Sequence, residues 1–363
     1  MKITVNKKNL KKALSLVEKI VSKNTSLPIL NNILLKTENG RLKVSATNLE
    51  IGINFIIGAK IDEVGQIAVP ARILSDFISN IIDDKISLIV KNNILSINSE
   101  KYKTQILGFD AKDFPIIPKI KPKPLAIIPT KTLRSSLLSV LDSVAVSETR
   151  PELSGVLINF SNDKIIFAAT DSFRLTEKSV DFKNIYKQSL IIPRNTVVEL
   201  IRIAGELEGD LLFNVSDNQV SFSNDDFEMV SRIVDGNYPD YKKVIPDKFT
   251  SKVLINKEEL DKTVRMAGLF STNIADIKIN CSEGKMAILS KNSDKGEIEI
   301  VIDAVLKNDP FEVSLNFHYL LDGLKILETE KVVMEFTGQG SPLVLRPNDD
   351  KKDIIYLIMP LRK

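Results

Sequence analysis

An internal repeat constrains the fold of this 363-residue chain more than any other feature of its sequence. Three segments begin alike, each with a short apolar strand pattern, a polar helix start and an amphipathic helix. They are "ITVNKKNLKKALSLVEKI" from Ile3, "LAIIPTKTLRSSLLSVLDSV" from Leu125 and "SKVLINKEELDKTVRMAGLF" from Ser251. A repeat at this spacing indicates that one supersecondary unit is used three times along the chain.

A predicted hairpin follows each of these helices. The turns are Asn39-Gly40, Asn162-Asp163 and Glu283-Gly284, and each lies between alternating apolar runs. A second strand-helix unit then begins near Gln66, Ser189 and Phe311, and another hairpin follows it. Each repeat therefore contains two helices and several strands, which predicts an α+β fold with helices packed on antiparallel sheets.

The length of the chain and its proline-rich joints predict three domains. Single hydrophobic cores stop growing at roughly 250–300 residues, so more than one domain is expected. The segment "FPIIPKIKPKPLAIIP" at 114–129 is a stiff connector, and "VIPDKFTSK" at 244–252 is a shorter one. We place the domains at 1–124, 125–250 and 251–363. An edge strand of one domain can pair with the edge of the next, which removes edges that would invite aggregation.

Several classes of chemistry lack their residues in this sequence. No glycine-rich phosphate loop and no GxGxxG pattern occurs. His318 and Cys281 are the only histidine and cysteine, which argues against a zinc site, a Cys-His nucleophile pair or an intrachain disulfide. No apolar run approaches the roughly 20 residues of a membrane span, and the first residues do not resemble a secretion signal. We therefore expect a soluble cytoplasmic protein without cofactor or metal.

Paired aspartates occur at three places, and they leave one enzymatic alternative open. The pairs are Asp83-Asp84, Asp225-Asp226 and Asp349-Asp350, each beside turn-forming or charged residues. Solvated turn carboxylates are the ordinary interpretation. A metal-dependent nuclease would need carboxylates from separate elements to converge on one ion.

Positive charge is concentrated in the predicted helices, although the net charge of the chain is only +3. These helices span 6–23, 71–82, 130–147, 194–206, 257–270 and 316–328, and together they hold 15 basic and 10 acidic residues. The first helix contributes Lys7, Lys8, Lys11, Lys12, Lys19 and Lys23. This surface is either an ordinary solvated face or a surface that attracts nucleic-acid phosphates without reading sequence. Because no aromatic residues alternate with these cations, stacking on single-stranded bases is disfavoured.

Motifs along the whole chain resemble one protein family. The clearest are "ATDSFRL" (169–175), "VDGNYPDYKKVIP" (234–246) and the C-terminal "YLIMPLRK" (356–363). Together with "LPILNNILL", "VPAR", "IIPR" and the threefold repeat, they resemble the bacterial DNA polymerase III beta subunit family, the sliding clamps. The motifs occur in the family's order from one end of the chain to the other.

The resemblance implies an architecture and a function. In this family, each chain has three like domains, and two chains pair head to tail into a six-domain ring. Helices line the hole, and sheets form the outside. The ring encircles duplex DNA, tethers the replicative polymerase as a processivity factor, and has no catalytic activity. A scaffold that binds only proteins remains an alternative, and it would ignore DNA.

The resemblance also implies a pocket that receives short Leu/Phe-rich motifs. Its partners in the family are the DNA polymerase III alpha subunit, the clamp loader, other polymerases and repair proteins. Carried over by position, the pocket would use Leu153, Thr170, Ser172, Phe173, Arg174, Leu175, Pro239, Lys243, Val244, Ile358, Met359, Pro360, Leu361 and Arg362. Apolar anchors need an apolar cleft, an adaptable Met359 suits varied ligands, and an arginine can fix the polar groups of a peptide.

This sequence departs from the family inside that pocket. Ser172 stands where glycine is usual, and Phe173 stands where histidine or tyrosine is usual. If position 172 has a positive φ, the serine is slightly strained. Lys242-Lys243 replaces a commonly arginine-rich pair, and the chain ends in a charged Lys363.

Two further surfaces follow from the resemblance. The first faces the duplex, and its candidate residues are Lys23, Asn24, Arg72, Arg150 and Arg194. The second joins the two chains of the ring, where Leu269 and Phe270 would pack as an apolar plug against the domain-one edge near 101–109.

Overall fold

The computed structural model describes the chain except for residues 22–26, 121–123, 147–148, 184–186, 217 and 362–363. By its contacts the chain divides into two compact units. The first contains Met1–Leu133 and Glu199–Ile233, and the second contains Arg134–Val198 and Val234–Lys363. Helices and antiparallel sheets make up both units, which confirms the predicted α+β class. Among the described residues, no helix is long and apolar enough to cross a membrane.

The first unit is built on one large antiparallel sheet. Its main path follows the order β8 (Lys103–Leu107), β7 (Ile94–Asn98), β6 (Lys85–Lys91), β1 (Lys2–Asn6), β4 (Ile51–Glu63), β16 (Phe227–Arg232), β15 (Gln219–Ser223), β14 (Asp210–Ser216) and β9 (Pro124–Pro129). The strands β2 (Asn32–Glu38), β3 (Arg41–Thr47) and β5 (Gln66–Pro70) branch from β4 through β3. Asn39 and Gly40 have φ values of 51° and 74°, so the predicted two-residue hairpin joins β2 to β3.

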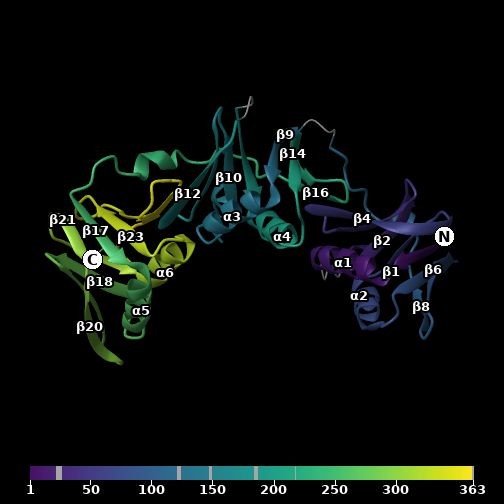
Figure 1. Ribbon diagram of the computed structural model, residues 1–363, viewed down its shortest axis with the longest axis horizontal. Helices are drawn as coiled ribbons and strands as arrows, with labels where there is room; N and C mark the ends of the chain where they lie inside the picture. The colour runs from purple at the N-terminus through teal and green to yellow at the C-terminus, as the bar shows by residue number, and fades with distance from the viewer. Residues whose placement is uncertain (22–26, 121–123, 147–148, 184–186, 217, 362–363) are drawn as a thin grey trace. The chain divides into compact units, whose positions relative to one another are not determined.

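Two helices cover this sheet in the first repeat. The apolar stripe predicted for α1 (Lys7–Val17) is buried, and Asn6 caps its start by accepting hydrogen bonds from the backbone of Lys8 and Asn9. The helix ends earlier than expected, because a 3₁₀ turn follows at Glu18–Ile20 and Val21 is already extended. Figure 1 shows α2 (Ala71–Asn80) beside α1 under the same strands.

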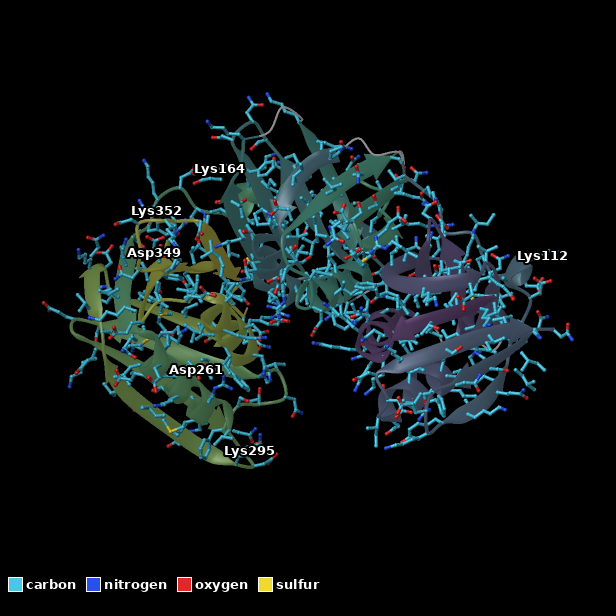
Figure 2. The ribbon with its side chains drawn as sticks, turned by 45° about the vertical axis from the view of Figure 1, so that its right-hand side comes forward. Lys112, Lys164, Asp261, Lys295, Asp349 and Lys352 are labelled. Carbon is cyan, nitrogen blue, oxygen red and sulfur yellow. The ribbon has the colours of Figure 1, made fainter. Side chains whose placement is uncertain are left out.

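The second unit contains two sheets. The larger follows the order β13 (Gln188–Pro193), β10 (Gly155–Phe160), β11 (Lys164–Thr170), β12 (Arg174–Asp181), β25 (Ile354–Ile358), β24 (Leu343–Pro347), β23 (Lys331–Phe336), β17 (Ser251–Asn256) and β21 (Val305–Asn308). The smaller follows the order β20 (Gly296–Asp303), β19 (Lys285–Asn292), β18 (Asp276–Ser282) and β22 (Phe311–Asn316). Figure 2 labels Lys295 in the turn between β19 and β20.

The helices α5 (Lys257–Gly268) and α6 (Phe317–Ile326) pack closely in this unit. A Cβ atom added to Gly268 would lie 2.7 Å from the ring of Phe317, so the two helices approach where only glycine fits. Cys281 is buried in the same core, and burial raises the pKa of its thiol to about 11. The buried structural thiol is therefore the interpretation that the structure supports.

The predicted middle domain is shared between the two units. Its helices α3 (Thr130–Leu141) and α4 (Arg194–Ala204) each contain residues of both. Its strand β16 pairs with β4, and its strand β12 pairs with β25. Strands from neighbouring repeats thus pair, as expected, and each half of the middle repeat continues the sheet of its neighbour. The boundaries near Pro124 and Thr250 stay predictions.

Candidate partner-binding site

The stretch from Thr170 to Arg174 forms a closed turn between β11 and β12. The Thr170 hydroxyl donates to the carbonyl of Arg174 at 2.7 Å and accepts from the amide of Ser172 at 3.1 Å. One carboxylate oxygen of Asp171 accepts from the amides of Phe173 and Arg174, each at 2.9 Å. Threonine and aspartate therefore satisfy the backbone of the turn, which leaves the following side chains free to project.

Ser172 lies at the tip of the turn with a φ of 77°. This is the positive φ considered from the sequence, and the residue is strained there because it has a Cβ atom. Its hydroxyl lies 3.3 Å from Nη1 of Arg150, which donates to it, and Arg150 also pairs with Glu152 at 3.1 Å. The structure therefore places Arg150 beside this turn. Its predicted contact with the duplex stays a prediction.

Arg174 links the turn to the C-terminal repeat. Its Nε donates to Asp171 at 3.0 Å, its Nη1 donates to Asp322 of α6, and its guanidinium lies 4.6 Å from the ring centre of Tyr319. Burial would lower the pKa of Arg174, but Tyr356, Asp322 and Asp171 raise it above its ordinary value. The guanidinium is a fixed charge held between carboxylates, which limits the donors it can offer to a peptide.

Apolar side chains lie under the turn. A buried cluster contains Leu157, Ala168, Leu175, Ile191, Tyr241, Val344 and Leu357, and partly buried Tyr238 and Met359 pack against it. Three predicted pocket residues are fully enclosed, namely Leu153, Leu175 and Ile358, so they can form only the floor of a cleft. Phe173 and Val244 are 59% and 48% exposed, so they are available for direct contact.

The C-terminal tail and the 238–244 connector border the same region. The amide of Met359 donates to the carbonyl of Phe173 at 2.8 Å, and the amide of Leu361 donates to Ser314 at 2.9 Å. Tyr241, next to Pro239 and Asp240, donates its hydroxyl to Glu177 of β12. Lys243 is exposed and pairs with Asp240 at 3.1 Å. Pro360 is half-buried, and Arg362 lies outside the described residues.

The structure therefore brings most of the predicted pocket residues to one side of the β12–β25 pair. Sequence reasoning missed Asp171, Tyr319 and Asp322, which hold Arg174. Asp171 stands inside the "ATDSFRL" motif, and its turn-forming chemistry was a usable signal. Asp322 lies 148 residues from Arg174, and nothing local to either residue indicates their contact.

The candidate duplex-facing residues are dispersed. Lys23 and Asn24 lie outside the described residues. Arg72 is 83% exposed on α2 and lies 3.7 Å from Asp76. Arg194 begins α4, and its amide donates to the carbonyl of Ser154 at 3.0 Å.

The candidate ring-interface residues lie just beyond the end of α5. Leu269 is 69% exposed, and Phe270 is half-buried. The strand β20 forms an edge of the smaller sheet of its unit, and β8 forms an edge of the large sheet in the first unit. Leu107 and Phe109, at the end of β8 and just after it, are 73% and 44% exposed. Each unit thus presents an unpaired strand edge beside exposed apolar side chains.

Comparisons with known proteins agree along the whole chain. Family models of the DNA polymerase III beta subunit match its N-terminal domain to residues 1–118, its central domain to 127–240 and its C-terminal domain to 242–362. The beta sliding clamp of Synechocystis sp. is 29% identical and that of Bacillus subtilis 28%, and both alignments cover 100% of this chain and at least 99% of the relative.

Solved structures of the same kind superpose closely. The DNA polymerase III subunit beta of Pseudomonas aeruginosa matches with a TM-score of 0.96 at 27% identity, covering 100% of both chains. A sliding clamp from the same organism bound to griselimycin matches with a TM-score of 0.95 at 26% identity, again over 100% of both chains. Three domain matches in order, full-length relatives and these superpositions place the chain in the DNA polymerase III beta subunit family, the beta sliding clamps.

Proposed function

We propose that this chain is a DNA replication processivity factor, a homodimeric ring that encircles duplex DNA without catalysing a reaction. The observation that carries the proposal is the threefold repeat whose junctions are both made by antiparallel strand pairing, β4 with β16 and β12 with β25. Such junctions leave β8 and β20 as edges that a second copy can cover. A closed ring needs few phosphate contacts, because its topology retains it on DNA. We place this function in the cytoplasm.

The edges β8 and β20 are complementary in charge and polarity. Lys101 and Lys103 lie at one edge, and Glu297 and Glu299 lie on the other. We propose that β8 of one copy meets β20 of the next, with Leu269 and Phe270 packing near the exposed apolar residues at 107–109. Opposite charges would fix the register, and apolar contacts would supply affinity.

Unpaired lysines on α1 support a duplex-facing role for the helices. Lys8, Lys11 and Lys12 are exposed, and no ion pair joins them to another described residue. In the corresponding helix of the third repeat, α5, Lys262 pairs with Glu258 at 2.6 Å and Arg265 pairs with Asp261 at 2.7 Å. Figure 2 labels Asp261 on that helix. Free ammonium groups attract phosphates more strongly than groups already paired with carboxylates.

We assign the peptide-binding role to the region around the 170–174 turn. Exposed Phe173 and Val244, the buried apolar floor and the C-terminal tail support it as an anchor site. The proposed partners are the polymerase III alpha subunit, the clamp loader, and other polymerases and repair proteins with Leu/Phe-rich motifs. The griselimycin-bound relative gives a practical competitor for such peptides.

Two of the aspartate pairs make local contacts that favour a structural role. Asp226 pairs with Arg41, and Asp83 accepts from the amide of Lys101 at 2.9 Å. The nuclease alternative requires divalent-ion activity on DNA, and the proposed clamp requires none.

The proposal is tested by loading the protein onto nicked circular DNA with a clamp loader and washing in high salt. Half of the sample is then linearised. We expect retention on circles and loss from linear ends, since ordinary phosphate binding weakens steeply with salt. Removal by salt alone, or equal retention on linear DNA, would refute encirclement.

A further inference from the structure

The turn that precedes β12 has a second copy in the first unit, before β4. The hydroxyl of Thr47 donates to the carbonyl of Ile51 at 2.9 Å and accepts from the amide of Leu49 at 3.1 Å. The side-chain oxygen of Asn48 accepts from the amides of Glu50 and Ile51, at 3.1 and 2.8 Å. Each of these bonds has its counterpart in the turn from Thr170 to Arg174.

The strand that meets each turn is also equivalent. Arg174 pairs with Ile358 in β25, and the next amide, of Met359, donates to Phe173. In the same way, Ile51 pairs with Ser231 in β16, and the amide of Arg232 donates to the carbonyl of Glu50 at 3.2 Å. The first junction therefore has the backbone of the proposed peptide site with different side chains.

Leu49 has a conformation that folding alone does not favour. Its φ of 74° matches the 77° of Ser172, but leucine is rarely found there, because its Cβ atom is crowded. Its side chain is nevertheless 49% exposed, so it gains little burial in return. Strain of this kind is a reason to examine the surroundings for a binding site.

A cavity lies beside this turn. Its volume is about 270 Å³, and its lining includes Thr47, Leu49, Pro115, Ile116, Val230 and Arg232. The connector forms one wall, and it lies so close that a Cβ atom on Gly52 would be 2.7 Å from Ile117. Pro115 follows Phe114 as Pro239 follows Tyr238, so the proline-containing connectors correspond as well. The cavity is smaller than the roughly 300–1,000 Å³ of small-molecule sites, so it suits one or two side chains.

The chemistry of the lining defines the ligand. Ile116 is 92% exposed and, with Leu49, offers an apolar contact. Glu50 and Arg232 take the places of Phe173 and Met359, and no ion pair is made by either among the described residues. One unpaired charge of each sign beside an apolar cavity is complementary to an apolar side chain flanked by a basic and an acidic residue.

We propose that this cavity is a second site for linear motifs, which binds a short extended peptide with a branched apolar residue between a lysine or arginine and an aspartate or glutamate. The inference rests on the proposed function, because the 170–174 region supplies the analogy. Its selectivity differs, since the charges of Glu50 and Arg232 disfavour the wholly apolar anchors that suit Phe173 and Met359. One ring would then hold two kinds of partner at four places.

The test is a methyl NMR titration of the full-length dimer with labelled leucine and isoleucine methyl groups. The probe is acetyl-Gly-Lys-Leu-Asp-Gly-amide, and its matched control has glycine in place of leucine. We expect saturable shifts of the Leu49 and Ile116 methyls with the probe and none with the control. Arg232→Glu should weaken binding at least tenfold, and changing the aspartate of the probe to lysine should restore it in that variant.

Further variants separate this inference from the proposed function. Phe173→Ser should leave the shifts at Leu49 and Ile116 unchanged but abolish those caused at Leu153 and Leu175 by a Leu/Phe-rich peptide. Ile116→Ser, at an exposed position that folding tolerates, should abolish the first set alone. Absence of shifts at Leu49 and Ile116, with normal binding of the Leu/Phe-rich peptide, overturns the second site and spares the proposed function. If the Leu/Phe-rich peptide also fails to bind, the proposed peptide site falls with it.

Discussion

Removing the guanidinium of Arg174 should loosen the junction between β12 and β25. Its side chain is only 14% exposed, and it separates the carboxylates of Asp171 and Asp322, which are 16% and 34% exposed. Breaking a buried ion pair by deleting one partner costs about 3–5 kcal/mol. Because Asp322 remains partly hydrated, we expect Arg174→Ala to cost about 2–3 kcal/mol at this junction.

The matched control is Arg265→Ala on α5. Arg265 also makes two hydrogen bonds to a carboxylate, at 2.7 and 3.1 Å, but its side chain is 62% exposed. An exposed pair at this helical spacing contributes about 0.3–0.5 kcal/mol. The contrast between the two variants therefore isolates the effect of burial.

Native-state hydrogen exchange measures the effect locally, which avoids the assumption that a three-repeat chain unfolds in one step. The amides of β12 should exchange roughly 30- to 150-fold faster in Arg174→Ala, because every 1.4 kcal/mol is tenfold. In Arg265→Ala, the amides of α5 should change by no more than about threefold. Adding Asp322→Asn to Arg174→Ala should recover part of the loss. Equal effects in the two single variants would refute the reasoning.

Three further outcomes are expected. Deleting residues 359–363 should abolish binding of a Leu/Phe-rich peptide, measured by fluorescence anisotropy, and leave the dimer intact in sedimentation; undiminished binding would contradict the proposed pocket. Changing Lys8, Lys11 and Lys12 to glutamine should lower the salt dependence of duplex binding by about 0.9 per lost phosphate contact, whereas the same change at Lys257, Lys262 and Arg265 should have little effect; the reverse order would disprove the role of α1. Because the pKa of Cys281 is raised to about 11 by burial, the unfolded chain loses this proton first, so stability should fall as the pH rises from about 9 to 11; Cys281→Ala should flatten that slope in urea unfolding, and an unchanged slope would argue against the assignment.

The repeat made much of the architecture predictable. Hairpin turns such as Asn39-Gly40 carry their conformation in their residue types, since asparagine and glycine adopt positive φ readily. Pairing between neighbouring repeats followed from the general liability of strand edges. The division of the middle repeat did not follow, because it depends on how far each sheet continues through β4 and β25.

The candidate site was predictable where its chemistry is local. The turn motif at 170–174 satisfies its own backbone, and the glycine expected at 172 pointed to the positive φ that Ser172 has. Its match "ATNLEI" at 46–51 was present in the sequence, as far from it as the hairpin turn at 39 is from that at 162. Asp322 could not be anticipated, because its contact with Arg174 is made only when α6 packs beside β12.

The central claim is that two copies close head to tail around DNA, and covalent closure tests it most directly. Among the residues of the sequence only Cys281 is a cysteine, and it is buried, so introduced thiols can be cross-linked selectively. Lys103→Cys on β8 and Glu299→Cys on β20 place one thiol at each proposed edge. After loading onto circular DNA and treatment with a bismaleimide, the ring should stay on intact circles through detergent denaturation and leave when the DNA is cut. Ladders of open oligomers, or release from intact circles, would contradict a closed head-to-tail ring.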